Sequence, residues 1–393
     1  MDRLFQYFDF WDLIWGCGVY VGLICLLATS PIMNRILLSD RRGLLLYILL
    51  CFFVFIFSLL NVVFEVLPVF PDSLLYAELY VNGSNGIYLS FSKEIYLFLL
   101  NMLSIPLLGS LTGLIAVQWV CYILSYMLLA RAWSFYSADA ESAKVSFLLY
   151  MLYPAALMFV GMPMRESFFL LGFSIFIYGL VGFIGNGSGL KFIFLGIVIA
   201  VLMRAQFLII LVSYFYLSIF FMKNKWRNVL VFSIVPIASI NIFLQLTGYS
   251  LTPEWLSYIR QDAADRYAVS GFVYGDFDWH SYFDVLLDVP SLTAQFVFSP
   301  FPILHNIGLL RFGAYALDLI FVVIVLVLSL KSLMQTANRY WLFLIVLGFV
   351  VLGFWEFYIG GAVRHRMPVV LLMLFPASFE INKYIKRLVL DEK

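Results

Sequence analysis

Runs of about twenty apolar residues recur along this chain and constrain its fold more than any other feature. A run of this length crosses the hydrocarbon core of a bilayer as an α-helix, because each helical residue rises about 1.5 Å. The clear runs are residues 12–29, 43–66, 111–131, 145–161, 167–185, 228–247, 309–333, 341–361 and the shorter run 367–379. The sequence therefore predicts an all-α, polytopic transmembrane helical bundle.

The composition supports the same class. Hydrophobic residues make up 64% of the 393 residues and charged residues 12%, whereas a soluble domain is about 25% charged. A chain with so few charged residues cannot cover its surface with polar groups. Lipid must therefore surround it. The net charge of +1 argues against a nucleic-acid partner. We expect a single integral membrane domain over residues 1–393, without a cleavable signal peptide.

One apolar stretch, residues 191–222, is too long for a single span and carries Arg204 near its middle. As one helix it would be about 48 Å long, well above the hydrocarbon thickness of about 30 Å. Two short helices that meet at Arg204 are expected instead. The total is then about eleven spans.

Residues 95–110 contain Asn101, Ser104 and Pro106 and are expected to form an interfacial helix instead of a span. All basic connections then fall on one side: Arg35/Arg41/Arg42, Lys223/Lys225/Arg227, Lys331/Arg339 and Lys383/Lys386/Arg387. Cytoplasmic loops are rich in Lys and Arg. The N-terminus is therefore expected outside and the C-terminus inside. Residues 67–110 and 248–306 become the two large external loops.

Two acidic positions on the external side are catalytic candidates. Asp72 follows the second span, where a carboxylate could accept a proton from a substrate hydroxyl; the commoner role of such a residue is to cap a helix. Arg165 and Glu166 lie in the next external turn, at the start of the helix that follows it. The positive end of the helix dipole stabilises the Glu166 carboxylate there. The alternative is an ordinary interfacial ion pair. Because charge at membrane depth is energetically costly, a functional role for these residues is favoured.

External arginines are candidates for binding phosphate, because a guanidinium holds phosphate oxygens through paired hydrogen bonds. Arg204 fits this role, with snorkelling to the surface as the alternative. The run Arg364-His365-Arg366-Met367-Pro368 places three basic residues opposite the other basic loops. A bound phosphate or pyrophosphate would compensate them, and His365 is a reserve candidate base, as is His280 in the second external loop. An error in the topology is the alternative.

The long external segment 248–306 contains the remaining polar candidates. Asp276, Asp278 and His280 form an Asp-x-Asp-x-His pattern whose carboxylates could hold a divalent ion, although a solvated turn is the commoner outcome. No metal or other cofactor is firmly implied. The prolines of residues 298–305 preclude a straight helix, so a re-entrant segment that dips into the membrane edge is expected there.

The order of these features resembles the GT-C superfamily of membrane glycosyltransferases and related bacterial surface-polysaccharide enzymes. Members place an acidic residue in the first large external loop, as Asp72 is, and a charged residue in a short external turn, as Arg165 and Glu166 are. They break a Gly-rich apolar stretch with a basic residue, as in residues 196–204. They often carry Arg-x-Arg-x-Pro near the C-terminus, as in residues 364–368. The first external loop departs from the pattern in having one clear acid where the family has a pair.

The resemblance implies transfer of a sugar or saccharide from a polyprenyl-phosphate or polyprenyl-pyrophosphate carrier to a glycan or lipid acceptor. It places the active face on the extracytoplasmic side of a bacterial cytoplasmic membrane. Arg165, Arg204, Arg364 and Arg366 would bind the donor phosphate, and Asp72 would deprotonate the acceptor. Aromatic residues of the external face could stack on sugar rings: Tyr76, Tyr80, Trp255, Tyr274 and Trp279.

Two other functions fit the pattern less well. A polymerase or ligase of the O-antigen type shares the substrate class but extends a chain. A flippase or other transporter would line a path through the bilayer with polar groups and often shows inverted repeats, whereas these charges gather on one face.

Overall fold

The computed structural model of the chain describes residues 4–37, 40–67, 70–82, 91–136, 139–221, 252–268, 274, 277–301, 309–336, 338–356 and 358–391. Within these residues the protein is helical and contains no strand. The predicted all-α class is therefore confirmed for the part that the structure describes. The predicted span at residues 228–247 lies outside the described residues.

Six of the described helices are long and apolar enough to cross a membrane. They are α1 (Phe10–Ala28), α3 (Arg41–Phe64), α6 (Leu111–Trp133), α9 (Glu166–Asn186), α15 (Leu309–Thr336) and α18 (Met367–Asp391). Three shorter apolar helices are α10 (Leu190–Met203), α11 (Leu208–Phe220) and α16 (Arg339–Trp355). The chain is thus an integral membrane protein with transmembrane helices. The count of about eleven spans and their orientation stay predictions.

The helix break predicted at Arg204 is confirmed. α10 ends at Met203, Arg204 has φ −150° and ψ 85°, and a short 3-10 turn leads into α11. The interfacial helix predicted over residues 95–110 corresponds to α5 (Phe91–Ser104), which begins and ends earlier than expected and is too short to be counted among the spans.

Three predicted boundaries were wrong. The span expected over residues 145–161 is two helices, α7 (Ala140–Met151) and α8 (Pro154–Phe159), because Pro154 keeps Tyr153 in an extended conformation. The span expected over residues 341–361 ends at Trp355 and is followed by the short α17 (Ile359–His365). The last helix, α18, continues through Pro376 to Asp391, well past the expected end at residue 379.

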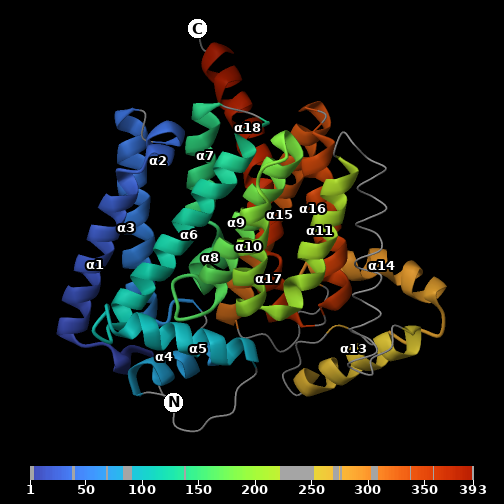
Figure 1. Cartoon of the computed structure of the whole chain (residues 1–393), viewed down its shortest axis with the longest axis horizontal. Helices are drawn as coiled ribbons and strands as arrows, with labels where there is room; N and C mark the ends of the chain where they lie inside the picture. The colour runs from blue at the N-terminus through green and yellow to red at the C-terminus, as the bar shows by residue number, and fades with distance from the viewer. Residues whose placement is uncertain are drawn as a thin grey trace. The chain divides into compact units, whose positions relative to one another are not determined.

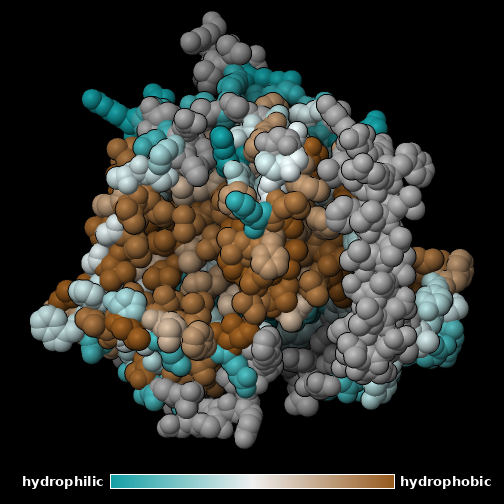
Figure 2. All heavy atoms as spheres, viewed as in Figure 1, coloured by the Kyte–Doolittle hydropathy of each residue, from teal (hydrophilic) through white to brown (hydrophobic). Residues whose placement is uncertain are grey.

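The described chain divides into two compact units. Unit 1 contains Met1–Leu208, Ile324–Thr336 and Leu371–Lys393, and unit 2 contains Ile209–Val323 and Ala337–Val370. In unit 1, α4 (Pro71–Asn82) and α5 lie across one end of the upright helices α1, α3 and α6 (Figure 1). Apolar side chains of α1 and α3 are exposed on the outer flank at the left of Figure 2, as a surface in contact with lipid would require.

Glycine residues let α9 and α10 pack closely in unit 1. A Cβ added at Gly196 of α10 would lie 2.4 Å from the backbone nitrogen of Phe176 in α9. A Cβ at Gly172 or Gly179 of α9 would lie 2.7 Å or 2.6 Å from a backbone nitrogen of α10. Small residues at helix contacts are typical of membrane proteins, because packing replaces the hydrophobic effect as the driving force. This contact brings the start of α9 beside the end of α10.

Buried polar contacts fix the other helices of unit 1. The Tyr20 hydroxyl of α1 donates a hydrogen bond to the Cys51 carbonyl of α3 (2.7 Å). The Asp12 carboxylate of α1 accepts hydrogen bonds from the backbone N–H (3.3 Å) and the hydroxyl of Thr112 at the start of α6. The Trp119 indole of α6 donates to the Ser58 hydroxyl of α3 (2.9 Å). Backbone and side-chain groups that cannot reach water are thereby paired.

Unit 2 contains α13 (Pro253–Ala268) and α14 (Tyr282–Val297), which occupy much of the predicted second external loop. Trp279 lies buried before α14, stacks on Phe354 of α16 with ring centroids 5.5 Å apart, and donates its indole N–H to Asp288 (2.8 Å). α14 ends at Val297, immediately before the Pro-rich segment 298–305, where the prolines of that segment were expected to preclude a straight helix. The second half of the predicted re-entrant segment, residues 302–305, lies outside the described residues.

Candidate functional site

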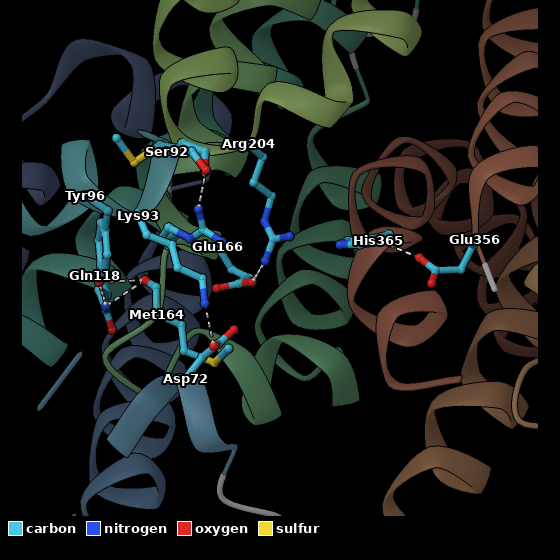
Figure 3. A network of polar contacts seen from close by, with 12 residues as sticks. Asp72, Ser92, Lys93, Tyr96, Gln118, Met164, Glu166, Arg204, Glu356 and His365 are labelled. Carbon is cyan, nitrogen blue, oxygen red and sulfur yellow. Dashed lines mark hydrogen bonds and ion pairs between the residues drawn. The ribbon is translucent and has the colours of Figure 1, made fainter. Parts of the chain in front are cut away.

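Four separate segments of unit 1 bring charged and phenolic side chains together: α4, the first turn of α5, the turn before α9 and the break after α10 (Figure 3). Each segment is a helix end or a break, where backbone groups lack helical partners and polar side chains are favoured. We call the following side chains the polar cluster: Asp72, Tyr76, Lys93, Arg165, Glu166 and Arg204.

Arg204 and Glu166 form a buried ion pair in the polar cluster. The Arg204 guanidinium contacts the Glu166 carboxylate through Nη2 and Oε1, and the side chains are only 4% and 3% exposed. Glu166 is the first residue of α9, where the positive end of the helix dipole also stabilises a carboxylate. The two predicted site residues are therefore brought together, and Glu166 is placed to hold Arg204 in position.

Arg165 links three segments around this pair. Its Nη1 atom donates hydrogen bonds to the Ser92 hydroxyl at the start of α5 (2.9 Å) and to the carbonyl of Met203, the last residue of α10 (3.0 Å). A cation at the carbonyl end of a helix is favourable, because the helix dipole is negative there. Arg165 is buried, so its positive charge acts on the cluster with little screening by water.

Asp72 and Lys93 form the accessible part of the polar cluster. Lys93 Nζ donates to Asp72 Oδ1 at 3.3 Å, and the side chains are 29% and 30% exposed. A helix starts here as predicted, but α4 begins at Pro71, so Asp72 lies inside the first turn and is not the N-cap. The exposed carboxylate can be reached by a substrate hydroxyl. Lys93, 21 residues away along the chain, is a site residue that the sequence pattern did not reveal.

The turn before α9 is held by hydrogen bonds to one carbonyl. The Tyr96 hydroxyl of α5 and the Gln118 amide of α6 both donate to the Met164 carbonyl, at 3.0 Å and 2.9 Å. Both side chains are fully buried (Figure 3). They fix the backbone on which Arg165 and Glu166 follow. Sequence reasoning missed this support, because Tyr96 and Gln118 are single polar residues in apolar stretches.

Arg366 and Asp318 form a second buried ion pair, in unit 2. Both side chains have no exposed surface, and Arg366 Nε donates to Asp318 Oδ2 at 3.1 Å. Arg366 Nη1 also donates to the carbonyls of Val297 (2.8 Å) and Ser299 (3.0 Å). Protein acceptors therefore surround the Arg366 guanidinium, and its predicted contact with a donor phosphate stays a prediction. Asp318 supplies the negative charge that was predicted to come from a bound phosphate or pyrophosphate.

The Glu356–His365 pair also belongs to unit 2. His365 Nδ1 lies 2.5 Å from Glu356 Oε2, and the other carboxylate oxygen accepts the Tyr358 backbone N–H at 3.1 Å (Figure 3). A Cβ at Gly361 would lie 2.4 Å from Glu356 Oε1, so a larger residue there would displace the carboxylate. Arg364 is half-buried on the same short helix. Glu356 was not singled out in the sequence.

The remaining candidates are dispersed. Asp276 lies outside the described residues. Asp278 and His280 pair at 3.3 Å, but their side chains are 83% and 77% exposed, as in a solvated turn. Among the described residues, no group of three or more His, Cys, Asp or Glu could hold a metal ion.

The predicted sugar-stacking aromatic residues are mostly in the protein interior. Tyr76, Tyr80, Tyr274 and Trp279 are buried, and only Trp255 is partly exposed. The stacking prediction is therefore wrong for these four, because a sugar ring can stack only on an accessible aromatic face.

No known protein family, no curated protein and no solved structure matches the chain closely enough to indicate a relationship. The resemblance to the GT-C superfamily thus stays a prediction from the order of motifs.

Proposed function

We propose that this protein is a membrane glycosyltransferase that moves a sugar or saccharide from a polyprenyl-phosphate or polyprenyl-pyrophosphate carrier to a glycan or lipid acceptor. The observation that carries the proposal is the polar cluster of unit 1. An accessible carboxylate and three cationic groups from distant segments lie together at one end of lipid-compatible helices. A phosphate on an apolar carrier needs such an arrangement, in which cations lie at the end of an apolar helix bundle.

In the proposed reaction, Asp72 accepts the proton of the acceptor hydroxyl. The acceptor oxygen forms a bond to the anomeric carbon, the bond from that carbon to the phosphate oxygen breaks, and the electron pair stays on the phosphate. Negative charge on the phosphate grows during this step. Arg165 and Arg204 stabilise it most in the transition state, because their positions are fixed before the reaction starts. Glu166 is a positioning residue for Arg204.

Arg366 has no part in this mechanism, and Arg364 remains a proposed ligand for the same class of anion in unit 2. We further propose that the cluster faces the extracytoplasmic side of the cytoplasmic membrane. The predicted positive-inside orientation supports this placement.

Mass spectrometry of lipid-linked saccharides from cells with and without the protein tests the proposal. A transferase predicts that a shorter polyprenyl-linked glycan or an unused donor accumulates in its absence, and the missing mass identifies the transferred unit. A polymerase predicts complete but unpolymerised units. A pool complete in composition but confined to the cytoplasmic face would refute catalysis and support a transporter.

A further inference from the structure

Tyr76 is the one member of the polar cluster whose polar group has no protein partner among the residues that the structure describes. Its side chain is 1% exposed, and its hydroxyl is buried without a hydrogen bond. Such groups are rare in native proteins, because a buried hydroxyl that gives up water without a replacement costs free energy. A ligand that supplies the missing hydrogen bond would explain why a tyrosine occupies this position.

The surroundings of Tyr76 indicate the chemistry of that ligand. Arg165 and Arg204 are close enough to act electrostatically on its hydroxyl, as are Asp72 and Glu166. Burial raises the pKa of Tyr76 to about 12, although the two arginines act in the opposite direction. Tyr76 lies on α4, which is not one of the candidate spans. Its hydroxyl is therefore protonated at neutral pH and can donate a hydrogen bond.

The position of the hydroxyl is fixed by packing. The Tyr76 ring meets the Tyr96 ring edge-on, with centroids 4.7 Å apart and planes at 83°. Tyr96 is itself held by its hydrogen bond to the Met164 carbonyl (3.0 Å). The Tyr76 hydroxyl is thus presented to the cluster without a large loss of side-chain freedom on binding.

We propose that the Tyr76 hydroxyl donates a hydrogen bond to a phosphate oxygen of the lipid-linked donor, beside Arg165 and Arg204. The inference rests on the proposed function and names a third phosphate-binding residue of the polar cluster, after Arg165 and Arg204. Phosphate is favoured over a sugar hydroxyl because two guanidinium groups select an anionic oxygen, and a hydroxyl donates more strongly to an anion.

Tyr76→Phe tests this inference, because it removes one oxygen atom and no hydrogen bond within the described protein. Stability should be unchanged or slightly higher, while affinity for the phosphate should fall by about tenfold to a hundredfold. Tyr80→Phe is the matched control on the same helix. The Tyr80 hydroxyl donates to the Ser110 carbonyl at 3.2 Å, so its loss should lower stability and leave phosphate binding unchanged.

The experiment measures binding of farnesyl phosphate and of uncharged farnesol to the purified full-length protein and both variants, together with their melting temperatures. Selective binding of farnesyl phosphate by the wild type, weakened only in Tyr76→Phe, supports the inference. Equal binding by wild type and Tyr76→Phe overturns the role of Tyr76 and leaves the proposed function standing. A wild type that does not prefer the phosphate overturns both. A large fall in the melting temperature of Tyr76→Phe would show that the hydroxyl serves the fold.

Discussion

The buried Arg204–Glu166 pair predicts a strong energetic coupling between the break after α10 and the start of α9. Arg204→Ala leaves the Glu166 carboxylate in a site where it is 3% exposed, and Glu166→Gln leaves the guanidinium 4% exposed without its counter-ion. Breaking a buried pair from one side costs about 3–5 kcal/mol, because an uncompensated charge stays out of water. The double variant removes both charges and should cost less than the sum of the single variants.

The expected coupling free energy is about 2–3 kcal/mol. It is measured with a double-mutant cycle on the free energy of unfolding in mixed detergent micelles. A parallel cycle on Asp72→Asn and Lys93→Met is the control, because that pair is about 30% exposed and should couple by less than about 1 kcal/mol. Equal coupling in the two cycles would refute the conclusion that burial makes the Arg204–Glu166 pair a fixed part of the cluster.

Three further predictions concern stability and are checked by thermal unfolding in detergent. Gly196→Ala should destabilise the protein by about 1–3 kcal/mol, because the added Cβ would meet the α9 backbone. Gly185→Ala is the control and should not destabilise it, because a Cβ there meets nothing within 4 Å. Equal effects of the two substitutions would contradict the close packing of α9 and α10. Arg366→Ala should cost about 3–5 kcal/mol and Arg364→Ala much less, and the reverse order would restore Arg366 as a ligand-binding residue. Asp12→Ala should cost about 1–2 kcal/mol through its lost bonds between α1 and α6, and an unchanged melting temperature would show that these bonds do not stabilise the bundle.

Local signals in the sequence predicted several features of the fold. The length of the apolar stretch and the charge inside it predicted the break at Arg204, and the charged turn predicted the helix start at Glu166. The pairing of these residues was not predictable, because they are 38 residues apart and only the packing of α9 on α10 joins them. The same holds for Lys93, whose partner Asp72 is 21 residues away.

Arg366 shows why a charge pattern alone can mislead. Its position on the predicted external side suggested that an external anion must neutralise it. The compensating anion is Asp318, 48 residues earlier in α15, and an apolar helix with one carboxylate gives no sign of its partner. The boundary errors have a similar origin. α7 ends before Pro154, as a proline ring requires, whereas α18 continues through Pro376, whose neighbours Phe375 and Ala377 are buried.

In the proposed reaction, the polar cluster of unit 1 catalyses sugar transfer and Asp72 is the base. The most direct test is the profile of lipid-linked saccharides in cells whose chromosomal gene for this protein is deleted. The cells carry the wild type, Asp72→Asn or, as a control at an exposed residue, His280→Ala, each at the same level in the membrane. We expect Asp72→Asn to lower transfer by about 10²–10⁴-fold and to reproduce the profile of cells without the protein, while His280→Ala restores the wild-type profile. A near-normal profile with Asp72→Asn would show that Asp72 is not the base.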